Sequence, residues 1–540
     1  EMADYYWAAR DLSSTKKTYE KAAQLILEQV DKIFIGLSES DKIRYWTRIR
    51  NILEKYYAYA LYTGVPSIQE KAYNVYLATK ALILSETAQL RRRLEKSNDT
   101  AIVRIYQDWQ EQKDYVTKLY TYSPQELAEL GVNLAQEEAR LNALERQLTA
   151  MVGDIRLPRP SWKDIRSKLP TGTAAIDWIR TRVPNTDSIV YYAVLITPQA
   201  KKLIVIPFPN GKKMEDYYLF RYTQSILNFE RDTTSYRAYW APIEEKLPPD
   251  TKTLFVSNDG LFHQINLSTI GLPAGGYLVD KYQIIYHSRL ASLVRPPRPV
   301  KFYEGRKAWI VADPDFNGGL PSDSTYVPEL PGTAQEARAL QELFQAAGYL
   351  PYVYTRREAT ELKAKETKSP YILHIATHGV FLPYDERIGA LIGIQSTSAL
   401  ANPLFRSALL LADAGRTMIS GSSPDPDKDG ILNAYELLTL SLENTELVAL
   451  SACETGLGEV QNGEGVYGLQ RAFLIAGARH LLLSLWKVDD EATRDFMTTF
   501  YRQWLTVRLP IPEAFWNAQK EMRKARVQPY FWGAFVLVRP

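Results

Sequence analysis

The sequence predicts an α/β protein with a mostly parallel sheet flanked by helices, preceded by an N-terminal all-helical region. Three observations carry this prediction. Residues 1–152 contain little Gly or Pro, and their apolar residues recur at intervals of three and four. Runs of β-branched and aromatic residues begin near residue 157. Beyond about residue 300 such runs alternate with helical patterns, as in parallel sheets that are covered by helices.

The helical region, 1–152, is expected to be an α-hairpin array or the end of a helical repeat solenoid of the TPR-like kind. No clean repeat of about 34 residues is visible, which leaves both options open. Ser123 and Pro124 supply a start signal for one long helix over 125–151, whose leucines lie close to one stripe. Such a region would be either a partner-binding arm or a scaffold.

Residues 153–300 are predicted to form a second, β-rich domain. The expected strands are 188–196 and 201–208, which suit a hairpin, followed by 252–258 and 282–287. The stretch 296–300, PPRPV, is typical of a linker.

Residues 301–540 are predicted to form the third domain, in which strands and helices alternate. Thr333 and Glu336 suggest a capping box at the start of its first helix. The expected strands are 308–314, 371–379, 445–453 and 480–486, and the expected helices are 333–347, 431–440, 465–476 and 490–507.

Composition excludes several classes of protein. The 540 residues are 46% hydrophobic and 24% charged, which argues against wholesale disorder. With 65 Lys and Arg against 62 Asp and Glu, the net charge of +3 provides no global field for nucleic acid or an anionic membrane. Cys453 is the single cysteine, so no internal disulfide and no cysteine-based zinc site can form.

No apolar run is long enough to predict a membrane-spanning helix. The first ten residues lack the pattern of a secretion signal and resemble a helix interior, which leaves open a longer natural chain.

Two reactive side chains follow predicted strands of the third domain. His378 comes at the end of YILHIAT, and Cys453 comes at the end of TELVALSA. Sites in open α/β sheets form outside the carboxyl ends of the strands, so the two would face each other if their strands are neighbours. An imidazole beside a thiol supplies the base for covalent acyl transfer. The backbone N–H groups of Gly379 and Cys453 are the expected oxyanion donors.

These runs resemble the CHAT domain, a caspase-like (clan CD) cysteine peptidase family related to separase. The resemblance rests on HIATHG (374–379), SACETG (451–456), GEGV (463–466) and LWKVDD (485–490), and upstream on NDGLFHQINL (258–267) and LPGTAQEA (330–337). It implies a caspase-like fold in which 153–300 is a degenerate pseudo-caspase half. It also implies a catalytic dyad, with Cys453 as the nucleophile and His378 as the general base and acid.

The resemblance further implies a cytoplasmic, bacterial-type endopeptidase that requires no cofactor. Its expected partners are a protein substrate, with a gasdermin-like defence protein as the leading idea, and a protein activator bound to the helical arm. Direct contact with nucleic acid or membrane is not expected. Two alternatives remain: a non-catalytic CHAT/helical interaction scaffold, or a latent peptidase that opens when a partner binds the arm.

Several residues near the proposed dyad are candidates for supporting roles or for the substrate pocket. His374 is expected to be a buried, hydrogen-bonded support on the same strand face as His378. Some relatives place an acid two positions before the nucleophile, where this chain has Ser451, so a medium apolar P1 side chain such as Leu or Met is the default expectation. Asp490, four residues after Trp486, matches an arginine-reading acid of separase, but it could instead cap the next helix. The candidate substrate-pocket residues are therefore Ser451, Trp486 and Asp490.

The stretch 425–436 has the spacing of an EF-hand calcium loop. Carboxylates occupy positions 1, 3, 5 and 12, with Gly430 at position 6. Calcium could therefore bind here, although the preceding residues are not helical. In the alternative interpretation, Asp429 caps a helix and Glu436 lies on its exposed face. The four candidate ligands are Asp425, Asp427, Asp429 and Glu436.

Overall fold

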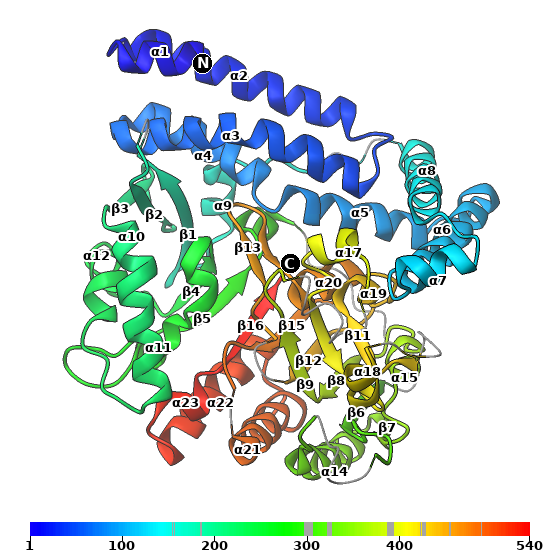
Figure 1. The fold of residues 1–540 in the computed structure, drawn as a ribbon. Coiled ribbons are helices and arrows are strands. Elements are labelled where there is room, and N and C mark those ends of the chain that lie inside the picture. Colours follow the sequence, from blue (N-terminus) through cyan, green and yellow to red (C-terminus); the bar gives the residue numbers. More distant parts are fainter. Residues whose placement is uncertain are drawn as a thin grey trace.

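One continuous eleven-stranded sheet runs through the centre of the protein, and the N-terminal helices lie across one end of it (Figure 1). The strand order is β3-β2-β1-β4-β5-β16-β15-β12-β8-β6-β7. The computed structural model describes residues 1–153, 155, 157–183, 186–295, 306–320, 327–385, 394–421, 423, 428–452, 455–487 and 489–540. The predicted α/β architecture with an all-helical N-terminal region is confirmed.

The helical arm, defined as residues 1–152, ends in two helices where one long helix was expected. The predicted helix over 125–151 is interrupted, because Gly131 adopts a left-handed φ of +66° and Asn133 then caps a new helix by accepting from Gln136 N–H. Ser123 does form the expected cap, with Glu126 completing a capping box. The helices are α1 (Met2–Ala8), α2 (Leu12–Ile33), α3 (Glu39–Thr63), α4 (Pro66–Thr79), α5 (Leu82–Glu95), α6 (Thr100–Leu119), α7 (Pro124–Glu129) and α8 (Leu134–Val152).

The first half of the sheet carries the predicted hairpin and one strand that the sequence did not reveal. β2 and β3 pair antiparallel, as expected, and β1 pairs antiparallel with β2 and parallel with β4. The strands are β1 (Thr173–Arg182), β2 (Ile189–Ile196), β3 (Ile204–Phe208), β4 (Thr253–Ser257) and β5 (Gln283–His287). The short helix α9 (Trp162–Lys168) precedes β1, and α11 (Leu219–Leu227) lies between β3 and β4.

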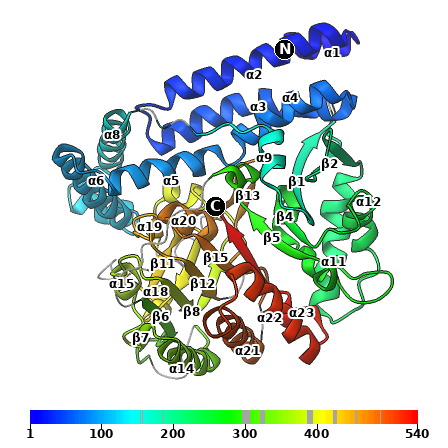
Figure 2. The same cartoon turned by 180° about the vertical axis from the view of Figure 1, so that it is seen from behind.

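The second half of the sheet contains β6 (Lys307–Pro314), β7 (Leu350–Arg356), β8 (Ile372–Ala376), β12 (Leu447–Ser451), β15 (His480–Ser484) and β16 (Phe535–Arg539). β16 joins the halves, since it runs parallel to β5 but antiparallel to β15. β1, β4, β5 and β16 therefore point in one direction, and β15, β12, β8, β6 and β7 point in the other. Three helices, α14 (Pro331–Ala346), α21 (Asp490–Tyr501) and α22 (Ile511–Ala525), lie at the end of the molecule away from the arm (Figures 1 and 2).

Two small β-structures replace segments that were predicted to be helical. The helix expected at 431–440 begins as β11 (Ile431–Asn433) and becomes helical only in α19 (Ala434–Leu437). β11 forms a three-stranded sheet with β10 (Ser407–Leu410) and β9 (His378–Phe381). The helix expected at 465–476 begins as β14 (Gly465–Tyr467), which pairs with β13 (Glu459–Gln461), and α20 (Leu469–Ala476) follows.

The seam between the two halves contains a buried histidine, and we expect it to make the fold acid-sensitive. His287 ends β5, is 6% exposed and lies opposite Arg539 of β16. Burial, and secondarily the Arg539 charge, lowers the pKa of His287 from 6.5 to about 3. The unfolded chain then binds a proton that the folded chain does not, so stability falls as pH drops from 6.5 towards 3. His287→Gln should reduce this loss by about 2 kcal/mol at pH 5. Urea unfolding at pH 7.5 and 5.0 tests this; equal pH dependence in both proteins would contradict it.

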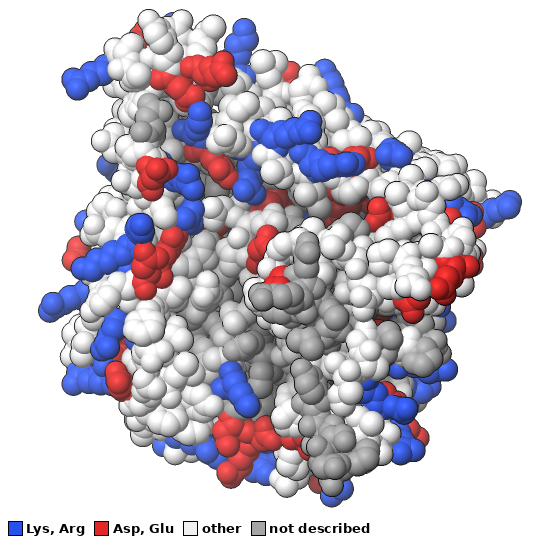
Figure 3. Space-filling model, in the orientation of Figure 1, with Lys and Arg blue, Asp and Glu red and all other residues white. Residues whose placement is uncertain are grey.

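Charges of both signs are interspersed on the surface. On the face shown in Figure 3, Lys and Arg side chains lie beside Asp and Glu side chains, as the near-neutral composition predicts. Within the described ranges, no helix is long and apolar enough to cross a bilayer.

Candidate active site

The strands that lead to His378 and Cys453 are hydrogen-bonded neighbours. β8 and β12 pair parallel, with Ala376 opposite Ser451. His378 lies two residues beyond the first of these paired positions, and Cys453 lies two residues beyond the second. Parallel strands bring their carboxyl ends to the same edge of a sheet, so the adjacency that the dyad hypothesis needs is present. Cys453 and Glu454 lie outside the described residues.

His378 does not end β8 but begins β9. β8 stops at Ala376, and β9 pairs with β10 in the separate three-stranded sheet, with Gly379 opposite Leu409. The expectation that His374 and His378 share one strand face is therefore wrong, because the chain leaves the large sheet between them. This turn takes the imidazole of His378 out of the sheet core to a partly exposed position.

A backbone carbonyl orients the His378 ring. Its Nε2 lies 2.8 Å from the carbonyl oxygen of Pro328. A carbonyl can only accept, so Nε2 carries the hydrogen and Nδ1 is left as the proton acceptor. Burial lowers the pKa of His378 below 6.5, although the Pro328 carbonyl partly opposes this, and the nearby Lys487 charge lowers it further. A neutral imidazole whose Nδ1 can accept a proton has the protonation state that a general base needs.

A cavity lies beside the ends of β8, β12 and β15 and brings the three candidate pocket residues together. Ser451, Trp486 and Asp490 all line it. Its other walls come from the first turns of α14 and α21 and from Phe535 of β16. The lining residues are Leu330, Gly332, Thr333, Glu336, Thr377, Ser451, Ala452, Ser484, Trp486, Asp490, Thr493 and Phe535. Among these described lining residues, Glu336 and Asp490 are acidic and none is basic.

Glu336 supplies the buried carboxylate of this cavity, a role that the sequence did not suggest. The predicted capping box is wrong: α14 begins at Pro331, and the Thr333 hydroxyl donates to the Leu330 carbonyl instead. Glu336 is 1% exposed and turns inward, where its Oε2 accepts from Ser451 Oγ at 2.9 Å. Its Oε1 lies 2.8 Å from His374 Nε2.

His374 is confirmed as a buried, hydrogen-bonded support. It has no exposed surface, and its Nδ1 lies 3.1 Å from Tyr501 Oη of α21. A chain of hydrogen bonds thus runs from Ser451 through Glu336 and His374 to Tyr501 beneath the cavity. Such a fully bonded network holds the end of β12, and with it the cavity floor, in one arrangement.

The two adjacent acids at the start of α21 have separate places. Asp489 is the N-cap, and its Oδ1 accepts from Ala492 N–H at 3.0 Å. Asp490 lines the cavity, against Gly332 of α14. A β-carbon at Gly332 would lie 2.4 Å from the β-carbon of Asp490, so only glycine permits this approach. The cap interpretation thus applies to Asp489, which leaves Asp490 available at the cavity.

The proposed calcium loop is only partly described. Asp425 and Asp427 lie outside the described residues. Asp429 accepts from Ile431 N–H at 2.7 Å, and Asn433 rather than Asp429 caps the helix. Glu436 is not exposed: it completes that capping box and pairs with Lys365 Nζ at 2.7 Å. Over the described ranges, no group of three or more His, Cys, Asp or Glu is arranged to hold a metal ion. Calcium binding stays a prediction.

The three remaining histidines, His263, His287 and His480, lie elsewhere. Burial lowers the pKa of His263 to about 4, and His287 lies in the seam described above. His480 is 7% exposed and its Nδ1 lies 3.3 Å from Glu446. None of the three lines the cavity beside His378.

The part of the chain that contains the candidate active site matches a known family. The family model described as "CHAT domain" matches residues 233–540, more than half of the chain. The chain belongs to the CHAT-domain family. The match contains His378, Cys453 and the whole lining of the cavity, and it begins within the first half of the large sheet.

Curated relatives of this CHAT protein are much longer than the chain. Tetratricopeptide repeat protein 28 of Mus musculus is 26% identical over 286 residues, and that of Homo sapiens is 25% identical over 286 residues. Each alignment covers 50% of this chain and 11% of the relative, so the chain spans about a tenth of the relatives' length.

Among solved structures, two of the Saccharomyces cerevisiae separase–securin complex are similar, with TM-scores of 0.39 and 0.38 at 10% and 11% identity. They cover 97% and 98% of this chain and 40% of the other.

Proposed function

We propose that this CHAT protein is a cysteine endopeptidase with Cys453 and His378 as its dyad. The supporting observation is the pairing of Ala376 with Ser451, which places the two chain segments on neighbouring strands at one edge of the sheet. The cavity beside this edge supplies room for a substrate side chain. The chemistry uses only groups of the chain itself.

Nδ1 of His378 takes the proton from the Cys453 thiol, and the thiolate attacks the scissile carbonyl. The backbone N–H groups of Gly379 and Cys453 stabilise the resulting oxyanion. The imidazolium, held through Nε2 by the Pro328 carbonyl, then gives its proton to the departing amine. Water activated by His378 hydrolyses the thioester and frees the thiol.

The cavity favours a basic P1 side chain over the apolar one expected from Ser451. Glu336 and Asp490 both line it, while Trp486 and Phe535 offer apolar surface to an aliphatic stem. Carboxylates attract a guanidinium or ammonium, and a hydrogen bond to a charged group is worth about 1.5–3 kcal/mol. The pocket therefore supports cleavage after arginine or lysine.

We expect Asp490→Asn to lower the preference for P1 Arg over P1 Leu about tenfold, measured as the ratio of kcat/KM on matched fluorogenic peptides. Asp489→Asn is the matched control, because asparagine also caps helices well and this residue does not line the cavity. An unchanged ratio in Asp490→Asn, or a wild type that prefers Leu, would refute the basic pocket.

The proposed substrate is a protein, and a gasdermin-like defence protein is the leading idea. A separate protein activator is proposed to bind the helical arm. N-terminal proteomics of a lysate, comparing wild type with Cys453→Ala, tests this. New amino termini that need Cys453 support a peptidase. Their absence, with no adduct of a peptidyl electrophile at Cys453, supports the scaffold instead.

A further inference from the structure

The chain after Cys453 forms a hairpin that contacts the segment carrying His378. This nucleophile hairpin, defined as 459–467, comprises β13 and β14 and begins six residues after the cysteine. Glu459 pairs with Arg406 at 2.5 Å, and Arg406 also donates to the Leu382 carbonyl at 3.0 Å. Leu382 directly follows β9, so the base of the hairpin is tied to the strand that begins with His378.

The tip of the hairpin lies between the helical arm and the first half of the sheet. The carbonyl of Gly463 accepts from Ala81 N–H, between α4 and α5, at 2.7 Å. The N–H of Gly463 donates to Asp259 Oδ1 at 2.9 Å. Gly463 has a left-handed φ of +70°, which glycine adopts readily. In this conformation its N–H and its carbonyl both bond to other parts of the chain.

Asp259 is the residue where these parts meet. It is 2% exposed and belongs to the NDGLF run, to which the proposed chemistry assigns no role. Its Oδ1 also accepts from Gly260 N–H at 3.0 Å. Its Oδ2 accepts from Arg180 N–H of β1 at 3.0 Å and lies 3.4 Å from Tyr76 Oη of α4, which also lies 3.1 Å from the Trp178 carbonyl. The backbone N–H groups of Gly260, Gly463 and Arg180 reach both oxygens and each requires an acceptor, so a carboxylate fits and an amide does not.

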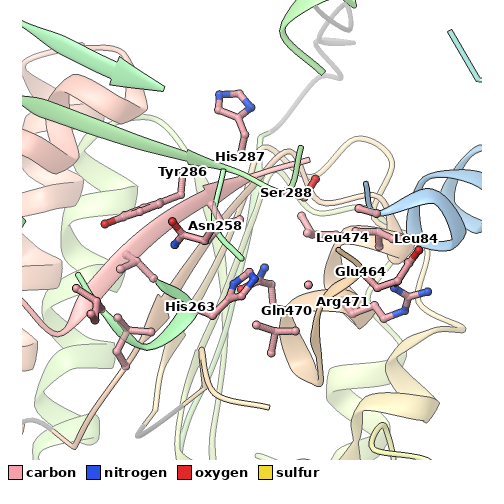
Figure 4. A pocket seen from close by; sticks show the side chains of 17 residues that line it. Leu84, Asn258, His263, Tyr286, His287, Ser288, Glu464, Gln470, Arg471 and Leu474 are labelled. Atoms are coloured by element: carbon pink, nitrogen blue, oxygen red, sulfur yellow. The ribbon is translucent and has the colours of Figure 1, made fainter. Parts of the chain in front are cut away.

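A second contact joins the hairpin to the arm. Glu464, next to the tip, is 2% exposed and lies 3.8 Å from Arg471 of α20, which in turn lies 3.6 Å from Glu39 of α3. Figure 4 shows Glu464 and Arg471 on one side of a cavity and Asn258 and His263, from the run that contains Asp259, on the other. Arm, hairpin and first half of the sheet are therefore packed around one buried polar junction.

We propose that Asp259 is a positioning residue that pins the nucleophile hairpin to the helical arm and the first half of the sheet, so that the arm controls how Cys453 is presented. This inference rests on the proposed peptidase function. It assigns the first half of the sheet a task in the reaction, and it gives a partner on the arm a physical route to the nucleophile.

Asp259→Asn tests the pin, since it keeps the volume but turns an NH2 group against N–H donors. The rate of inactivation by a peptidyl acyloxymethyl ketone, kinact, should fall about 100-fold. KI should stay unchanged, because no hairpin residue lines the substrate cavity. Hydrogen exchange should show lost protection in 459–467. Tyr76→Phe, which removes only the hydroxyl from the arm, should cause a smaller fall in kinact.

Thr79→Val is the matched control, since it removes a buried hydrogen bond to Tyr57 within the arm at the same junction. Both kinact and hairpin protection should be retained there. Unchanged protection in Asp259→Asn, or lost protection with kinact retained, would overturn the inference. If wild-type Cys453 is not labelled at all, the peptidase proposal fails, and hydrogen exchange alone decides whether Asp259 pins the hairpin.

Discussion

Replacing Cys453 with alanine is expected to reduce peptide turnover to background, a loss of about 10⁴-fold or more. The sulfur is the nucleophile that attacks the scissile carbonyl, and its removal leaves the chain without a covalent route. Turnover of a fluorogenic peptide and labelling by a peptidyl electrophile measure the effect. Turnover that persists in Cys453→Ala would refute the dyad outright.

His378→Gln is expected to have an effect of similar size, because acylation and thioester hydrolysis both lose the side chain that transfers the proton. His480→Gln is the matched control: His480 begins β15, at the end of that strand away from the candidate site, and it bonds to Glu446. Activity that is equal in the two histidine variants would show that His378 has no special role.

Lys80→Met is expected to give the largest loss of stability, about 3–5 kcal/mol in the free energy of unfolding. Lys80 Nζ lies 2.6 Å from Asp177 Oδ1, and the two side chains are 3% and 0% exposed. Burial already raises the pKa of Asp177, so without Lys80 the carboxylate would remain buried with no cation to offset its desolvation. The pair joins α4 of the arm to β1 of the sheet, and urea unfolding measures the loss.

The exposed pair of Lys55 with Asp4 is a matched control. Its separation is also 2.6 Å, but its side chains are 48% and 24% exposed. Solvent screens such a pair, so Lys55→Met should cost less than about 1 kcal/mol. The double variant Lys80→Met/Asp177→Asn should recover part of the loss, since it removes the stranded charge. Equal losses in Lys80→Met and Lys55→Met would show that burial of the pair contributes nothing.

Expectations from the sequence succeeded where the signal is local and failed where distant residues compete. The hairpin of β2 and β3 followed from alternation and turn residues in one short stretch. Glu336 shows the opposite case. Its spacing from Thr333 is that of a capping box, yet the carboxylate bonds to His374 and Ser451, which lie 38 and 115 residues away. Burial among these two partners outweighs the local cap.

The sequence by itself determined the all-helical start, most of the strands that follow it, and the CHAT motifs that place His378 and Cys453 after predicted strands. Those features depend on periodicity, turn chemistry and spacing, which are written within short windows of the chain. Only the tertiary structure decided that β8 and β12 are neighbours, that the Pro328 carbonyl orients His378, that Glu336 bonds to Ser451, and that Asp259 bonds to the hairpin tip. Each of these rests on hydrogen bonds between segments far apart along the chain, and such contacts exist only after the sheet and the arm have packed together.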